Sequence, residues 1–307
     1  MSSLRTDWKG VYPPIVTPFT EAEEIDEAAF RKVIDLLIDE GVHGIIVAGS
    51  TGEWYSLADD EVSRLLTLAK EQIADRVPLL AGTSSMSTHH AVALTERAAE
   101  LGCAGAMVLP PPYVLPTADE VVAHFEAVAD VGLPIMVYNN PKRTQVNLDA
   151  AFMERIAAFD SIVAMKDSVK DLYQASETIK RVGDRLAYFT GMEPYGNAIL
   201  ERGGVGFVSM MANICGSDVV AYYDHASAGR WTAGNRHQRV IEGLYEIDLA
   251  FGRGIYPTVK ACMNILGRHG GHLRRPYKDI KDRQTLGKLA DALADLGLAA
   301  ESSAAAD

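Results

Sequence analysis

One sequence pattern recurs along this chain of 307 residues: an amphipathic helical segment, a glycine, and then a short apolar run. In the first clear copy, apolar residues at helical spacing from Phe30 to Ile38 are followed by Gly41 and by the apolar run 44–48. Glycine often follows a helix because it adopts a left-handed backbone without strain. This sequence pattern therefore predicts a helix followed by a strand. It returns at 93–110, 121–139 and 198–210.

Eight short apolar runs mark candidate strands, and most of them start 25 to 34 residues apart, with helical patterns between them. They are Tyr12–Thr17, Gly44–Ala48, Pro78–Gly82, Ala104–Leu109, Pro134–Tyr138, Ile162–Lys166, Ala187–Thr190 and Gly204–Ser209. Nearly continuous apolar strands are typical of parallel sheets, which are buried on both faces. The pattern predicts an α/β fold, a closed (β/α)₈ TIM barrel. An open doubly wound sheet is the alternative, but its G-x-G-x-x-G fingerprint does not follow the first run.

The strand pattern stops after Ser217, and helical patterns then continue to about Leu298. We therefore expect two units: a catalytic barrel over residues 1–216, and a C-terminal helical extension over residues 217–307 that packs on the barrel. The final stretch, ESSAAAD, contains small and polar residues and is expected to be frayed.

Charge and composition narrow the classes of partner. The net charge of −12 argues against general affinity for nucleic acid or anionic membranes. The three cysteines are far apart in apolar stretches, as expected for reduced thiols in the cytoplasm, and the histidines show no metal-ligand spacing. Neither an N-terminal signal core nor an apolar run of membrane-spanning length is found. We expect a cytoplasmic protein that binds no nucleic acid, membrane or metal.

Lys166 is the first candidate for chemistry, because active sites of such barrels lie where the strands end. It directly follows the apolar residues 162–165. A lysine in apolar surroundings loses the solvation that favours its charge, so its pKa is expected to fall. The neutral amine can then attack a ketone and form a Schiff base. The alternative is a structural lysine, which either extends its charged end to solvent at the strand end or pairs with Asp167.

Three other strand ends carry polar groups. The stretch GSTGE at 49–53 can hold a carboxylate or phosphate through its hydroxyl and N–H groups, or it can be a simple turn. Tyr138 can shuttle protons if a neighbour polarises its hydroxyl, or it can be a core tyrosine. Arg143 can clamp a carboxylate, or it can be a surface arginine.

Together these features resemble the dihydrodipicolinate synthase / N-acetylneuraminate lyase family of Schiff-base pyruvate aldolases, over about residues 10 to 280. The resemblance rests on Tyr138 and Lys166 at a spacing of 28 residues, on GSTGE, and on GGVGFVS at the eighth run. It implies a class I lyase in which Lys166 forms a covalent imine with a 2-oxo acid, with no other cofactor. It also implies that Tyr138 shuttles protons, that Ser50 links it to Tyr113 in a hydrogen-bonded relay, and that Thr51 holds the substrate carboxylate.

The same resemblance places Arg143 against the second substrate, and Gly191 and Val208 in the lining of the 2-oxo acid pocket. The family supplies the Tyr113 position across a subunit interface, which implies a homo-oligomer, a dimer or a tetramer. The expected reaction is condensation or cleavage between pyruvate, or a related 2-oxo acid, and a small acidic aldehyde, as in dihydrodipicolinate synthase. The alternatives are a catabolic 2-oxo-3-deoxy sugar-acid aldolase or dehydratase of the same family, and a non-catalytic binding protein, which would be expected to lack the lysine or the tyrosine.

Several positions depart from the family members that lysine inhibits. Trp54 and Tyr55 stand where those members have small or polar residues, Pro112 replaces an aromatic residue, and Met86 replaces an asparagine. Gln145 stands where lysine-synthesising members have a glycine. We therefore expect no feedback inhibition by lysine.

Overall fold

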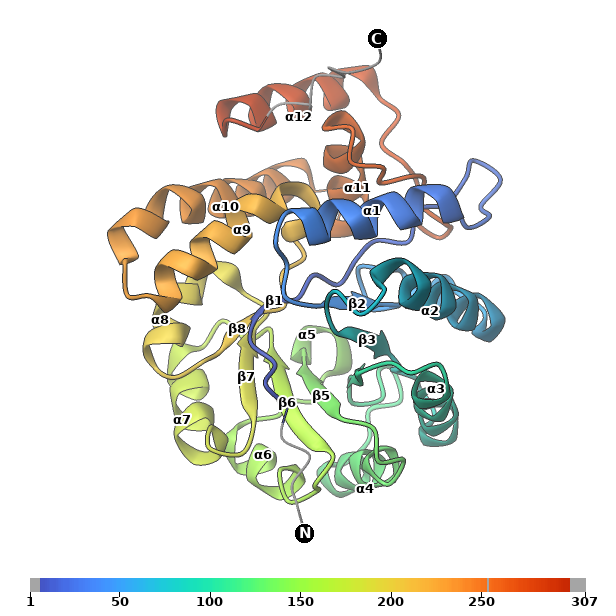
Figure 1. Ribbon diagram of the computed structural model, residues 1–307, viewed down its shortest axis with the longest axis vertical. Helices are drawn as coiled ribbons and strands as arrows, with labels where there is room; N and C mark the ends of the chain where they lie inside the picture. The colour runs from blue at the N-terminus through green and yellow to red at the C-terminus, as the bar shows by residue number, and fades with distance from the viewer. Residues whose placement is uncertain (1–5, 253, 299–307) are drawn as a thin grey trace.

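The computed structural model describes residues 6–252 and 254–298, which form one curled parallel sheet surrounded by helices (Figure 1). Within these residues the sheet has eight strands, in the order β1-β8-β7-β6-β5-β4-β3-β2. They are β1 Gly10–Val11, β2 Ile45–Val47, β3 Leu79–Gly82, β4 Gly105–Val108, β5 Ile135–Asn139, β6 Ile162–Asp167, β7 Ala187–Thr190 and β8 Gly206–Phe207. Each paired neighbour runs parallel, as the continuous apolar runs predicted.

The two edges of the sheet are joined by the chain just after β1. Pro14 forms a parallel bridge with Ile46 of β2. The Ile15 N–H donates to the Ile46 carbonyl, and the Ile46 N–H donates to the Pro13 carbonyl, each at 3.0 Å. These contacts close the sheet into the predicted TIM barrel, so the alternative of an open doubly wound sheet is wrong.

The first strand begins earlier than the sequence predicted. β1 covers Gly10–Val11, whereas we expected Tyr12–Thr17. The Pro-Pro pair inside the expected run explains the difference, because proline has no N–H to donate and interrupts a strand ladder. The other seven predicted runs match the observed strands to within two residues at each end.

Helices alternate with the strands and surround the barrel (Figure 1). They are α1 Glu27–Asp39, α2 Asp59–Ile73, α3 Thr88–Glu100, α4 Ala118–Ala129, α5 Pro141–Thr144, α6 Ala150–Ile156, α7 Leu172–Val182 and α8 Gly196–Glu201, with short 3₁₀ turns η1 Trp54–Ser56 and η2 Glu193–Tyr195. α1 illustrates how the sequence directs this arrangement. Its buried face includes Phe30, Val33 and Leu37, and it ends just before Gly41, whose φ is +87°. A helix with one apolar face covers a sheet and leaves its other face in water.

The barrel interior has an apolar core separate from the layer between sheet and helices. Its buried side chains are Trp8, Tyr12, Ile46, Leu80, Met107, Leu109, Met136, Tyr138, Val163, Ala164, Phe189 and Val208. Because side chains fill a barrel of this size, the interior is no channel. Polar groups can gather only at its ends.

Four helices follow β8 in the described residues: α9 Ala212–Ser227, α10 Trp231–Phe251, α11 Ile255–Ile265 and α12 Arg283–Asp295. Figure 1 shows α10, α11 and α12, in orange to red, gathered on the side of the barrel where α1 lies. α9 is kinked at Cys215, where φ is −141° and ψ is 58°. The domain boundary that we predicted after residue 216 falls beside this kink and stays a prediction. The frayed end predicted at 301–307 lies outside the described residues.

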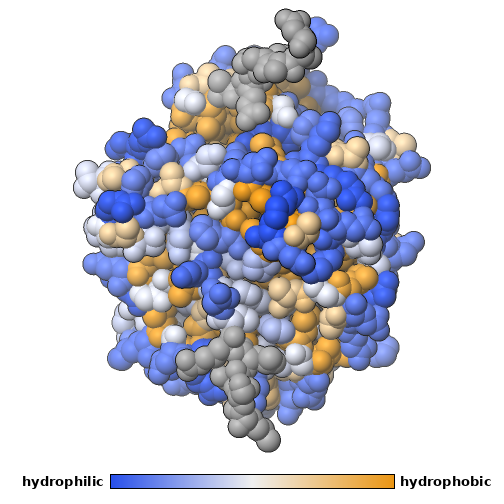
Figure 2. Space-filling model, in the orientation of Figure 1, coloured by the Kyte–Doolittle hydropathy of each residue, from blue (hydrophilic) through white to orange (hydrophobic). Residues whose placement is uncertain are grey.

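Figure 2 shows a face on which hydrophilic residues predominate and apolar residues form small areas. In the ranges that the structure covers, no helix combines the length and apolarity needed to cross a membrane. One apolar stretch stands out on the loop after β4, where Tyr113, Val114 and Leu115 are all exposed.

Candidate active site

A cavity of about 350 Å³ opens at the carboxyl ends of the strands. Every site residue that the sequence predicted lines it, except Tyr113: Ser50, Thr51, Tyr138, Arg143, Lys166, Gly191 and Val208. The lining also includes residues that the sequence analysis did not single out, among them Asn140, Ser168, Tyr245 and Tyr256. The parallel strands therefore bring the predicted residues together from widely spaced parts of the chain.

Lys166 and Tyr138 lie side by side because β5 and β6 are neighbours and the two residues are paired in register. The Lys166 ammonium nitrogen lies 4.0 Å from the centroid of the Tyr138 ring. Both residues are buried, and Lys166 is only 6% exposed. The spacing of 28 residues thus corresponds to one step across the sheet.

The hydroxyl group of Tyr138 is polarised by its neighbours. Burial alone would raise the pKa of this phenol, but the Lys166 charge and hydrogen bonds with Ser168, Asn140 and Lys166 outweigh burial and lower the pKa below its usual value. The Asn140 side-chain amide donates to the Tyr138 oxygen at 2.8 Å. A phenol with a lowered pKa releases its proton more readily, which suits a proton shuttle.

Asp167 has other partners than Lys166, so the alternative in which these two residues pair is not supported. Neighbouring residues of a strand point to opposite faces of a sheet. Asp167 accepts hydrogen bonds from the Tyr188 hydroxyl at 2.7 Å and from the Asn139 amide at 3.1 Å. Burial raises the pKa of Asp167 to about 6, although these bonds lower it. Among the described residues no carboxylate forms an ion pair with Lys166.

The GSTGE turn holds two hydroxyl groups at the cavity and turns its carboxylate away. Ser50 and Thr51 line the cavity. Glu53 adopts a left-handed backbone with φ of +59° and is fully buried. Its Oε1 lies 2.5 Å from the Lys260 ammonium nitrogen on α11. Ser50 and Thr51 of the turn therefore face the cavity, whereas Glu53 ties the turn to α11.

Gly191 makes room for the lysine side chain. A Cβ at this position would lie 2.3 Å from the Ser168 hydroxyl oxygen and 2.9 Å from Lys166 Cε. Real Cβ atoms do not approach other atoms this closely, so a side chain here would displace Lys166. Val208, fully buried, lines the same cavity.

Arg143 lies on α5, the single helical turn after β5, beside an aromatic group that the extension supplies. Its guanidinium carbon is 5.9 Å from the centroid of the Tyr256 ring on α11. Burial raises the pKa of Tyr256 to about 12, although the Arg143 charge and a hydrogen bond with Ser50 lower it. The Tyr256 ring also contacts Tyr55 and Tyr277, with centroids 6.1 and 5.6 Å away. No motif marked Tyr256, because it follows the last strand by many residues.

Tyr113 lies apart from this cavity within one chain. It is 85% exposed and its φ is +72°. The Ser50 hydroxyl, which the sequence analysis assigned to a relay with Tyr113, contacts Tyr256 instead. A role for Tyr113 therefore requires a second copy of the chain and stays a prediction.

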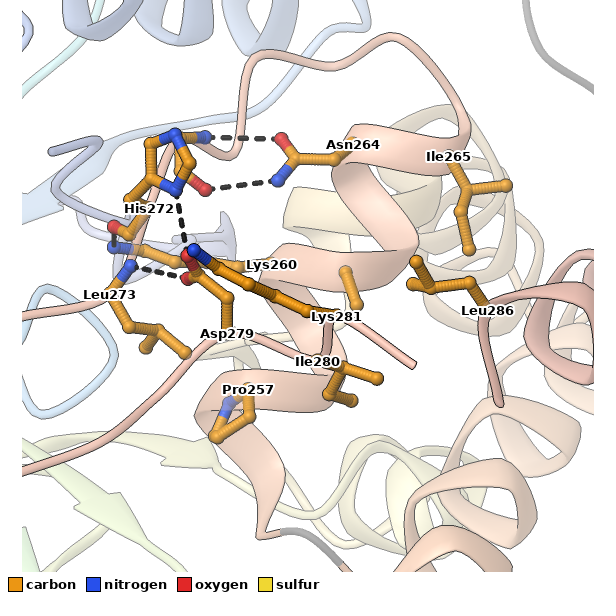
Figure 3. A pocket seen from close by; sticks show the side chains of 12 residues that line it. Pro257, Lys260, Asn264, Ile265, His272, Leu273, Asp279, Ile280, Lys281 and Leu286 are labelled. Atoms are coloured by element: carbon orange, nitrogen blue, oxygen red, sulfur yellow. Dashed lines mark hydrogen bonds and ion pairs between the residues drawn. The ribbon is translucent and has the colours of Figure 1, made fainter. Parts of the chain in front are cut away.

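A second cavity, of about 440 Å³, lies between α11 and the segment 271–286 (Figure 3). Its charged groups are already paired. Lys260 contacts Glu53, and His272 Nδ1 lies 2.7 Å from an Asp279 oxygen. Nor does any cluster of three or more His, Cys, Asp or Glu side chains in the described ranges suit a metal ion. The barrel mouth is therefore the better candidate for chemistry.

Comparisons with known proteins agree with this geometry. The model of the Dihydrodipicolinate synthetase family matches residues 7–295. The chain belongs to this family. An "Uncharacterized DapA-like lyase" of Rhizobium meliloti is 46% identical over 291 residues, which cover 95% of this chain and 97% of the relative. The 4-hydroxy-tetrahydrodipicolinate synthase of Thermodesulfovibrio yellowstonii is 33% identical over 295 residues, 95% of this chain and 99% of that one.

A solved structure shows the same fold. The crystal structure of dihydrodipicolinate synthase from Aquifex aeolicus superimposes with a TM-score of 0.90 at 29% identity, over 96% of this chain and 100% of that chain. The family membership, the relatives and the fold together identify an enzyme, a lyase of the class I aldolase type.

Proposed function

We propose that the protein forms a Schiff base between Lys166 and pyruvate or a related 2-oxo acid, and makes or breaks a carbon–carbon bond with a small acidic aldehyde. The observation that carries this proposal is the position of the Lys166 amine, 4.0 Å from the Tyr138 ring centroid and free of any carboxylate ion pair in the described structure. The amine lies beside a phenol of lowered pKa, which can exchange protons with the groups that react at the lysine.

The proposed steps use these two groups. The Lys166 amine attacks C2 of the 2-oxo acid, and loss of water leaves a protonated imine. The imine withdraws electrons, so either a proton leaves C3 or the C3–C4 bond breaks, and an enamine forms. In condensation, C3 of the enamine attacks the aldehyde carbon, and the aldehyde oxygen takes a proton. Tyr138 carries the protons in both directions. Addition of water then releases Lys166.

The other lining residues support binding of two acidic substrates. The Thr51 hydroxyl and backbone N–H, next to Ser50, are suited to hold the carboxylate of the 2-oxo acid. Arg143 offers a guanidinium group to the carboxylate of the second substrate. Gly191 and Val208 limit the space around the imine.

A second candidate is a catabolic aldolase or dehydratase of 2-oxo-3-deoxy sugar acids. It is favoured by Trp54, Tyr55, Pro112 and Met86, which depart from the family members that lysine inhibits and so argue against a regulated biosynthetic role. A dehydratase would use the same imine and enamine, but the enamine would expel a hydroxyl group as water instead of attacking an aldehyde.

We also propose that the chain works in the cytoplasm as a homo-oligomer, a dimer or tetramer, with no cofactor beyond the covalent imine. The exposed apolar stretch of Tyr113, Val114 and Leu115 supports an interface, because a contiguous apolar patch is typical of a contact surface. The buried free cysteines suit a reducing compartment. The net charge of −12 gives no support to binding of nucleic acid or anionic membranes.

Reductive trapping tests the proposal. Incubation with pyruvate and borohydride should add one pyruvyl group per chain, and peptide mass mapping should place it on Lys166. Lys142 and Lys170 line the same cavity and serve as internal controls, because both should remain unmodified. An adduct on either control lysine, or none with any 2-oxo acid tested, would contradict the mechanism.

A further inference from the structure

The carboxyl group of Asp167 lies on the opposite side of β6 from the cavity at the barrel mouth, and the proposed reaction does not use it. Asp167 is the last residue of β6, directly after Lys166, and is only 2% exposed. Successive side chains of a strand point to opposite faces of the sheet. Asp167 therefore points into the layer between the sheet and the helices, while its neighbour in the chain faces the cavity.

The two oxygens of this carboxylate hold different parts of the protein. Oδ2 accepts a hydrogen bond from the Tyr188 hydroxyl on β7 at 2.7 Å. Oδ1 accepts from the Asn139 side-chain amide at 3.1 Å and from the Val169 N–H at 3.0 Å. One oxygen therefore binds a core tyrosine, whereas the other binds the end of β5 and the turn after β6.

Both partners of Oδ1 are chain neighbours of residues at the cavity. Asn139 follows Tyr138 on β5 and is paired in register with Asp167. Val169 follows Ser168, whose side chain hydrogen bonds with the Tyr138 hydroxyl. The Ser168 N–H also donates to the Asn139 carbonyl at 3.0 Å. Holding Asn139 and Val169 in place therefore holds the two segments that carry Tyr138 and Ser168.

Asn139 is also held from its other side. Its side-chain oxygen accepts from the Leu148 N–H at 3.0 Å, and its amide nitrogen also donates to Asn147 Oδ1 at 3.1 Å. Asn147 in turn exchanges two hydrogen bonds with Gln174 on α7, at 2.7 and 3.1 Å. A buried network whose members are all hydrogen-bonded is rigid, so the end of β5 is fixed in one arrangement.

The charge state of Asp167 indicates that this network has a cost. Burial, together with the nearby Asp171 charge, raises the pKa of Asp167 to about 6, although the hydrogen bonds lower it. At neutral pH the group is therefore a buried carboxylate, and the partners described above are neutral donors. An apolar side chain would fill the same space without the free energy needed to bury a charge. The carboxyl group is thus explained by its hydrogen bonds and not by packing alone.

We propose that Asp167 is a positioning residue, which fixes through Oδ1 the strand ends that hold Tyr138 against Lys166. This inference rests on the proposed Schiff-base function and goes beyond it, because Asp167 touches neither the substrate nor the reacting atoms. A misplacement of about 1 Å between reacting groups can lower a rate by about 10²-fold. Ser50 and Thr51, proposed to hold the substrate carboxylate, follow β2 and make none of these contacts. The rate should therefore depend on Asp167 more than substrate affinity does.

The test measures imine formation with pyruvate by quenching with borohydride at timed intervals after mixing. A series of pyruvate concentrations separates the limiting rate from the half-saturating concentration. Asp167→Leu has a similar size but accepts no hydrogen bond, so its limiting rate should fall by about 10- to 100-fold. The half-saturating concentration should stay within about threefold of the wild-type value, a change smaller than the loss of one hydrogen bond.

Two further variants make the comparison specific. Asp167→Asn can still accept at its oxygen and donate to the Tyr188 oxygen, so its limiting rate should stay within about threefold of the wild-type rate. Tyr188→Phe is the matched control, because it removes the partner of Oδ2 and leaves both bonds of Oδ1. It should lower the melting temperature and keep the limiting rate. Circular dichroism shows that each variant is folded at the temperature of the assay.

If Asp167→Leu does not fold, Asp167→Ala replaces it, because water can then enter and bind the freed N–H groups. The same loss of limiting rate is expected. A folded variant of either kind that kept the wild-type rate would overturn the inference. Failure of both variants to fold would show a structural role only, which also overturns it.

The remaining outcomes separate the inference from the function on which it rests. An equal loss of rate in Tyr188→Phe, or in Asp167→Asn, would show that the bonds of Oδ1 do not position the reacting groups. A loss that appeared mainly in the half-saturating concentration would indicate substrate binding and would also contradict the proposal. Failure to trap any 2-oxo acid on Lys166 in the wild-type protein would instead overturn the proposed function.

Discussion

Lys166 and Lys260 are both buried lysines, yet their surroundings differ completely. Lys260 is 2% exposed, pairs with the Glu53 carboxylate and donates to the Thr17 and His272 carbonyls at 2.7 and 2.6 Å. Lys166 is about as buried but faces the Tyr138 ring and no paired carboxylate in the described residues. Burial is thus common to a structural lysine, Lys260, and to the proposed nucleophile, Lys166. What distinguishes them is whether every N–H of the ammonium group has an anionic or carbonyl acceptor.

Replacing each lysine by methionine, which has a similar size and no charge, gives the sharpest test of this comparison. Lys166→Met should lower kcat by about 10⁴-fold or more, since it removes the proposed nucleophile. Its stability should fall less than that of Lys260→Met, because in the described residues no carboxylate loses an ion-pair partner and the buried Glu193 loses only a more distant interaction with the Lys166 charge. Steady-state kinetics measures the loss of kcat, and chemical denaturation measures the stability of the variant. If Lys166→Met still formed an imine with a 2-oxo acid, Lys166 would not be the nucleophile.

Tyr138→Phe should have the next largest effect. The variant keeps the ring beside Lys166 but loses the polarised hydroxyl, so kcat should fall by about 10²–10⁴-fold, the usual contribution of a positioned acid–base group. The measurement is kcat with saturating 2-oxo acid, together with circular dichroism to show that the fold is kept. If kcat stayed near the wild-type value, Tyr138 would have no part in proton transfer.

Lys260→Met should affect stability and leave the chemistry in place. The variant leaves Glu53 buried without its cation, which costs about 3–5 kcal/mol of unfolding free energy. Chemical denaturation measures the loss, and borohydride trapping at low temperature should still modify Lys166. The double variant with Glu53→Gln serves as the control, since removal of both charges should restore part of the stability. Equal stability of the wild type and Lys260→Met would show that the ion pair between Glu53 and Lys260 does not stabilise the fold.

The smallest expected effect is that of free L-lysine, which should neither inhibit the enzyme nor raise its melting temperature at millimolar concentration. Trp54 and Tyr55 pack edge to face, with centroids 6.3 Å apart, and Tyr55 also contacts Tyr277. These bulky groups cannot make the same hydrogen bonds to an amino acid as the smaller polar residues of lysine-inhibited members, at about 1–3 kcal/mol per unsatisfied group. Calorimetry that detected sub-millimolar binding would contradict this and would favour a regulated biosynthetic role.

The sequence predicted those parts of the site that strand ends deliver. Lys166 could be singled out because it ends an apolar strand, and the family resemblance joined Tyr138 to it; the common edge of neighbouring parallel strands explains why the two residues meet. Tyr245 and Tyr256 could not be found in this way. They lie on helices of the extension, where an aromatic residue is typical of a core, and only tertiary packing brings them to the cavity. The register of the first strand was missed for a local reason, the Pro-Pro pair that interrupts its ladder.

The ion pair between Glu53 and Lys260 joins residues that are 207 positions apart in the chain. During synthesis at about 5–20 residues per second, roughly 10–40 s pass between the addition of Glu53 and the addition of its cation. A barrel that closed in this interval would enclose a carboxylate without its counter-ion. Closing the GSTGE turn before α11 has left the ribosome would therefore cost free energy, because it would bury an unpaired carboxylate. Tyr245 and Tyr256 are also translated after most of the cavity lining. The mouth of the barrel can then be complete only after α10 and α11 have been made, although Lys166 and most of the lining are translated far earlier.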